Sequence, residues 1–101
     1  MSTKQGLIRR LREHEVEIRR FGVQRLGLFG SFVKQRQVAD SDVDLLVEFH
    51  AEQETFKNFM GLGFLLEDIL GRRVEILTPE SLSPYIGPRI LEEVEYVAFR
   101  S

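Results

Sequence analysis

The chain has no cysteine, so neither a disulfide framework nor a thiolate metal site can contribute to its fold. This absence fits a cytoplasmic protein. Long apolar runs are also missing, since a run such as Leu45–Val47 is far shorter than a membrane span. Charged residues are spaced through residues 1–21, which predicts a helix there and no export signal. We therefore expect neither a membrane-spanning segment nor an exported product.

The length and the charge of the chain restrict its domain number and its possible partners. At 101 residues we expect one domain, residues 1–101, with a modest core and no second lobe. If the chain catalyses a transfer, we therefore expect a partner molecule to supply the acceptor. The net charge of −2 hides a basic N-terminal third: residues 1–36 hold nine Lys/Arg and three Glu. These charges are interleaved, which is typical of a solvated helix with i,i+4 pairs. We do not expect direct binding to nucleic acid.

Apolar spacing and turn residues predict seven alternating elements without repeats or linkers. This order indicates an α/β or α+β fold. The expected elements are a helix near residues 4–20, a strand Val23–Phe29, a short helix opening at Ser31, a strand Asp42–Phe49, a helix from Thr55 to about Leu70, a strand Arg73–Thr78, and a helical segment from Pro84 or Pro88.

Two acidic residues stand at the entrance of the second expected strand. Asp42 and Asp44 are two apart, so on a strand they share a face, with α-carbons about 6–7 Å apart. Such carboxylates repel each other unless a cation lies between them, and two Mg²⁺ ions about 3.5–4 Å apart fit that geometry. The alternative is that Asp40, Ser41 and Asp42 cap a turn. That alternative explains Asp44 poorly, because aspartate is disfavoured inside strands.

Two further features complete a candidate nucleotide site. Gly30-Ser31 ends a strand and opens a helix, so its backbone N–H groups and hydroxyl could receive a phosphate. Glu75 lies in mid-strand between the apolar residues Val74 and Ile76, where an unpaired charge would be costly. Glu75 is therefore the candidate third carboxylate.

The segment LFGSFVKQRQVADSDVDLLVEF resembles the signature of the minimal nucleotidyltransferases (MNT proteins) of the DNA polymerase beta-like superfamily. In that signature a strand ends in Gly-Ser, about ten residues follow, and Asp-x-Asp opens the next strand. The resemblance implies an α+β nucleotidyltransferase fold, α/β sandwich-like, with a mixed β-sheet flanked by helices. It also implies an Mg²⁺-dependent enzyme that transfers AMP from ATP. The implied acceptor is a tyrosine of a HEPN-domain ribonuclease toxin, with the transferase acting as antitoxin.

The resemblance also assigns roles to residues of this chain. The implied catalytic and metal-binding residues are Asp42, Asp44 and Glu75, and the implied nucleotide-binding residues are Gly30, Ser31, Lys34 and Arg36. Two positions depart from the family pattern. Lys34-Gln35 stands where members often carry Arg-Gly, and Glu75 stands where the third acid is usually aspartate.

Three functions stay open on this reasoning. The first is an adenylyltransferase antitoxin. The second is a non-catalytic antitoxin of the same fold, which the two departures favour. The third is a nucleotidyltransferase that acts on RNA or a small molecule, which only the basic N-terminal third favours.

Overall fold

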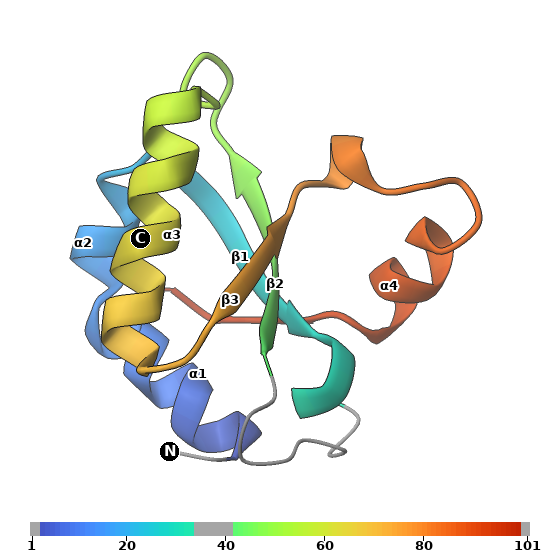
Figure 1. Cartoon of the computed structure of the whole chain (residues 1–101), viewed down its shortest axis with the longest axis horizontal. Coiled ribbons are helices and arrows are strands. Elements are labelled where there is room, and N and C mark those ends of the chain that lie inside the picture. Colours follow the sequence, from blue (N-terminus) through green and yellow to red (C-terminus); the bar gives the residue numbers. More distant parts are fainter. Residues whose placement is uncertain (1–2, 34–41, 100–101) are drawn as a thin grey trace.

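A computed structural model describes residues 3–33 and 42–99 of the chain (Figure 1). Short 3₁₀ turns follow the first and third strands, at Gly30–Phe32 (η1) and Pro79–Ser81 (η2). The described helices are α1 (Lys4–Glu13), α2 (Glu15–Arg19), α3 (Phe56–Leu70) and α4 (Gly87–Glu93), and the described strands are β1 (Val23–Phe29), β2 (Val43–Phe49), β3 (Val74–Leu77) and β4 (Glu95–Tyr96). Among these helices, none is long and apolar enough to cross a membrane.

The four strands form one sheet in the order β3-β2-β1-β4. Strand β1 is antiparallel to both β2 and β4, whereas β2 and β3 are parallel. The sheet is therefore mixed, and helices flank it. This confirms the predicted α+β fold.

One face of the sheet carries the main core. The side chains of Val43, Leu45 and Val47 alternate along β2 and are fully buried on this face. Helices α1, α2 and α3 cover it, as Figure 1 shows, with Leu11 and Leu66 among their buried residues. Every second side chain of the strand therefore packs against the apolar faces of the helices in one hydrophobic cluster.

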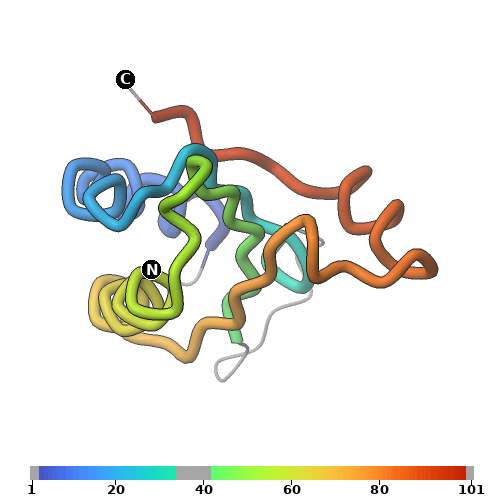
Figure 2. The backbone as a smooth tube through the Cα atoms, turned by 90° about the horizontal axis from the view of Figure 1, so that it is seen from above, coloured from blue at the N-terminus to red at the C-terminus, as the bar shows by residue number. Residues whose placement is uncertain are grey.

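The opposite face is covered only in part. Figure 2 shows the segment that holds α4 on the side of the sheet away from the other helices. Ile90 of α4 packs there against Phe29 of β1 and Leu46 of β2, in a second and smaller cluster. The ends of β1 and β2 beyond this cluster carry the candidate site.

Several expected boundaries differ from the structure. The expected helix near residues 4–20 is interrupted at His14, whose backbone leaves the helical region (φ −109°, ψ 23°). Ile18 after the interruption still reaches the core, while Val16 is exposed. The strand β4 and the turn η2 were not expected, because each is only two or three residues long and periodicity needs a longer window.

Candidate functional site

The turn after β1 is built on a glycine that no other residue could replace without strain. Gly30 has a φ of +78°, which L side chains rarely adopt. A β-carbon added at Gly30 would also collide with the carboxylate of Asp44. The backbone of the Gly30-Ser31 turn therefore lies directly against an acidic side chain.

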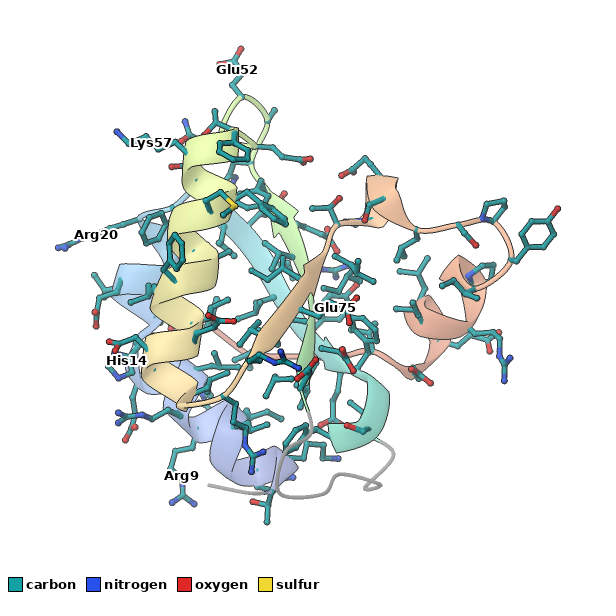
Figure 3. The ribbon with its side chains drawn as sticks, viewed as in Figure 1. Arg9, His14, Arg20, Glu52, Lys57 and Glu75 are labelled. Atoms are coloured by element: carbon teal, nitrogen blue, oxygen red, sulfur yellow. The ribbon has the colours of Figure 1, made fainter. Side chains whose placement is uncertain are left out.

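Asp44 and Glu75 face each other across neighbouring strands. They are register partners in the parallel pairing of β2 and β3. Their side chains lie on the face that also carries α4, and Figure 3 shows Glu75 on the α4 side of β3. Asp44 is half-buried, whereas Glu75 is exposed. Two carboxylates and the glycine turn thus meet at one end of the sheet.

The electrostatics of this end show that negative charge is crowded there. Burial, the neighbouring carboxyl of Glu75 and the charges of Asp42 and Glu93 raise the pKa of Asp44 to about 6. A carboxyl with such a pKa lies where like charges converge without full compensation. A hard divalent cation such as Mg²⁺ prefers several oxygen ligands, which the carboxylates around Asp44 can supply.

Asp42 lies just before β2 instead of inside it. Its Oδ1 accepts a hydrogen bond from the Arg73 Nε at 3.4 Å, in an ion pair that is largely exposed. Within residues 3–33 and 42–99, no three His, Cys, Asp or Glu side chains are already arranged to hold a metal ion. The expected strand therefore begins one residue later, at Val43, and Asp42 lies at its entrance with a carboxylate that pairs with Arg73.

The environment expected for Glu75 is also wrong. The apolar neighbours Val74 and Ile76 suggested that its charge would be buried, but the side chain is exposed. The reason is the topology. Strand β3 is an edge strand, and on the face to which Glu75 points the cluster around α4 includes Leu77 but leaves Glu75 uncovered.

The expected nucleotide-binding residues are described only in part. Ser31 is half-buried in the turn η1, directly after Gly30. Lys34 and Arg36 lie outside the described residues, and their roles stay predictions.

Two charged residues at the site were not expected. Glu93, the last residue of α4, accepts a hydrogen bond at its Oε1 from the Gly30 N–H at 3.3 Å. Arg73 pairs with Asp42 as described above. The sequence offered only weak signals, an Arg-Arg pair before β3 and a Glu-Glu pair in the last helix, and such pairs are common on solvated surfaces.

A shallow groove of about 340 Å³ runs beside the site, between α3 and the edge strand β3. Glu75 and Glu67 line it together with apolar side chains. Phe64, which also lines it, is 67% exposed, so part of the apolar stripe of α3 is surface and not core.

Comparison with known proteins gives consistent matches. The nucleotidyltransferase domain family matches residues 8–97. The chain is 43% identical over 88 residues to "Protein adenylyltransferase MntA" of Thermococcus cleftensis, which covers 86% of this chain and 88% of that protein.

Solved structures agree with this match. A structure described as a minimal nucleotidyltransferase is similar with a TM-score of 0.76 and 33% identity, over 89% of this chain and 92% of that one. A structure of tri-AMPylated Shewanella oneidensis HEPN toxin in complex with MNT antitoxin has a TM-score of 0.63 at 17% identity, over 92% of this chain and 73% of that one. The latter likeness shows the fold alone, whereas the former also supports the resemblance found in the sequence.

Proposed function

Because this chain belongs to the nucleotidyltransferase domain family, we propose that it transfers AMP from ATP, with Mg²⁺, to a hydroxyl group of a protein partner. The expected enzyme class, nucleotidyltransferase, is confirmed with the family. The nucleotide, the metal and the acceptor are the proposed part.

One observation carries the proposal most directly. The Gly30 turn packs against Asp44, and Asp44 faces Glu75 across the β2–β3 pairing. A turn that can receive phosphate and two carboxylates that can receive a cation thus lie within one small region. A triphosphate bound as its Mg²⁺ complex needs both features together.

The carboxylates have distinct proposed roles. Asp42, Asp44 and Glu75 would hold two Mg²⁺ ions, provided that Asp42 releases Arg73. When bound, the metal would supply positive charge that stabilises the attacking and leaving oxygens. Glu75, the more exposed of the facing pair, would take the proton of the acceptor hydroxyl.

The proposed reaction is a nucleophilic displacement at the α-phosphorus of ATP. A bond forms between the acceptor oxygen and the α-phosphorus of ATP, and the bond from the α-phosphorus to the bridging oxygen breaks. Pyrophosphate leaves with that electron pair, and the acceptor proton passes to Glu75. The Gly30-Ser31 turn would hold the triphosphate, with Lys34 and Arg36 near the phosphates.

The proposed acceptor is a tyrosine of a HEPN-domain ribonuclease toxin, and the chain would act as its antitoxin. The support comes from the sequence resemblance and from the similarity to a protein named as an adenylyltransferase. Exposed apolar side chains such as Phe64 in the groove beside Glu75 are also typical of surfaces that contact a protein partner. A cytoplasmic location, which the lack of cysteine fits, is part of this proposal.

A non-catalytic antitoxin of the same fold is the second candidate. The departures from the family pattern at Lys34-Gln35 and Glu75 favour it, because a longer carboxyl side chain changes the geometry around a metal. Such a protein would neutralise its partner by binding alone.

Labelled ATP distinguishes the two candidates. We expect the unmodified protein to transfer label to a co-encoded ribonuclease with Mg²⁺ and not with EDTA. Asp44→Asn should abolish transfer, because it removes the charge that the metal needs and preserves the shape of the side chain. Asp68→Asn, on the exposed surface of α3, is the matched control and should label its partner normally.

Two outcomes would contradict the proposal that the chain neutralises its partner by transfer of AMP. If the Asp44→Asn protein labels its partner as fast as the unmodified one, the proposed site is wrong. If it neutralises the ribonuclease fully without labelling, binding alone is the mechanism.

A further inference from the structure

Glu93 connects the last helix to the glycine turn. It lies 63 positions after Gly30 in the sequence and accepts a hydrogen bond from the Gly30 N–H at 3.3 Å. The contact is partly buried. A charged acceptor on a backbone N–H forms a stronger hydrogen bond than a neutral one.

The packing of α4 leaves Glu93 little freedom to move away. Ile90, three residues before it, is buried against Phe29 and Leu46. Val94, directly after it, packs so closely on β1 that a side chain on Gly27 would collide with it. Residues on both sides of Glu93 are therefore fixed to the sheet, and the carboxylate is presented to the turn by apolar packing.

The turn needs such support, because glycine is the least restricted residue. Gly30 without a partner could populate several backbone conformations, and only one of them places the following N–H groups as the structure shows. Asp44 packs against the α-carbon of Gly30, and Glu93 holds its N–H. Together they fix the residue from two sides.

We propose that Glu93 is a positioning residue of the nucleotide site, which holds the Gly30-Ser31 turn in the conformation that receives the triphosphate. This inference rests on the proposed function. Glu93 acts through the hydrogen bond of its Oε1 and not through its charge. Its charge by itself opposes the binding of a polyanion, because it already adds to the negative potential around Asp44.

A pair of substitutions separates the bond from the charge. Glu93→Gln keeps an acceptor oxygen and removes the charge, whereas Glu93→Ala removes both. Glu92→Ala, at the exposed neighbouring position, is the matched control. Each protein is titrated with ATP and Mg²⁺ by calorimetry, assayed for transfer to the partner, and examined by NMR for hydrogen exchange at the Gly30 amide.

We expect Glu93→Ala to weaken ATP binding by about fivefold, which corresponds to the loss of one ordinary hydrogen bond of about 1 kcal/mol. The KM for ATP should rise while kcat at saturating ATP changes little, and the Gly30 amide should exchange faster. Glu93→Gln should recover most of the affinity and the protection of this amide. Glu92→Ala should match the unmodified protein in all three measurements.

The inference is wrong if Glu93→Ala binds ATP as tightly as the unmodified protein. It is also wrong if Glu93→Gln is as impaired as Glu93→Ala while the Gly30 amide stays protected, since the charge would then be the active feature. Absence of Mg²⁺-dependent ATP binding by the unmodified protein would overturn the proposed function, and this inference with it.

Discussion

At the scale of single residues, the site depends on charges that the protein holds close together. Asp44 shows the effect of this crowding. Burial and the surrounding carboxyls of Glu75, Asp42 and Glu93 raise its pKa to about 6. In the unfolded chain, the same carboxyl titrates near its ordinary value of 3.8. The metal-free folded protein is thus less stable at neutral pH than it would be without this charge.

Asp44→Asn should therefore stabilise the metal-free protein in a pH-dependent way. At pH 4, Asp44 is protonated in the folded protein and only partly ionised in the unfolded chain, so the two proteins should differ little in stability. As the pH rises through about 6, Asp44 becomes charged in the folded unmodified protein, whereas asparagine stays neutral. The asparagine variant should then be more stable by about 1 kcal/mol, a value already reduced for solvent screening. Urea unfolding in EDTA at pH 4 and pH 8 measures this difference.

The control for this experiment is Asp68→Asn, which removes an exposed carboxylate of α3 outside the proposed site. Equal effects of Asp44→Asn at pH 4 and pH 8 would contradict the crowding of charge around Asp44.

At the scale of elements, α3 shows how local residues set boundaries. Thr55 caps its start, where the hydroxyl accepts a hydrogen bond from the Asn58 N–H at 3.1 Å. Gly71 ends it in the left-handed region with a φ of +64°. A β-carbon at Gly71 would meet nothing within 4 Å, so its glycine is required by backbone conformation alone. Gly30 differs, because there the conformation and the contact with Asp44 both require glycine.

Gly71→Ala should lower the free energy of unfolding by about 1 kcal/mol, which is the cost of a left-handed conformation for an L residue. Gly71→Asn should cost less, because asparagine tolerates this region. Urea unfolding measures both effects, and ATP binding, which does not involve this helix end, should stay unchanged. A loss as large for asparagine as for alanine would show that the backbone conformation is not the cause.

At the scale of the whole molecule, the fold brings basic and acidic parts of the chain together. Lys4 of α1 pairs with Glu95 of β4 at 3.1 Å, and Arg25 of β1 pairs with Glu48 of β2 at 2.8 Å. Arg25 also stacks on the ring of Tyr96, 3.7 Å from its centroid. The basic N-terminal third is therefore used in part within the molecule, in line with its interpretation as a solvated and paired surface.

Binding of ATP and Mg²⁺ at the proposed site should stabilise the whole fold. A ligand at one hundred times its dissociation constant adds about 2.7 kcal/mol of stability, which for a domain of this size raises the thermal midpoint by roughly 10 °C. The rise should occur with ATP and Mg²⁺ together, and should be much smaller with ATP and EDTA or with the Asp44→Asn protein. Thermal unfolding followed by circular dichroism measures it.

An equal rise for the Asp44→Asn protein would place the nucleotide elsewhere on the molecule. Asp68→Asn again serves as the control and should behave as the unmodified protein does.

Much of the fold was predictable because its signals are local. Strand β1 has the expected bounds, since a glycine with a positive φ stands on each side of it, at Gly22 and Gly30. The bounds of α3 follow from Thr55 and Gly71 in the same way. The Gly30-Ser31 turn and the acidic residues Asp42 and Asp44 were also identified, because the chemistry of phosphate and metal binding restricts residue type and spacing.

Local patterns in the chain were therefore enough to predict the residue types of the site and the elements that carry them. Which side chains meet depends on how these elements pack. The pairing of β2 with β3 placed Glu75 opposite Asp44 and left it exposed at the sheet edge, and the docking of α4 brought Glu93 to Gly30. Contacts of this kind join residues far apart in the chain, and their energies depend on packing that no local pattern encodes.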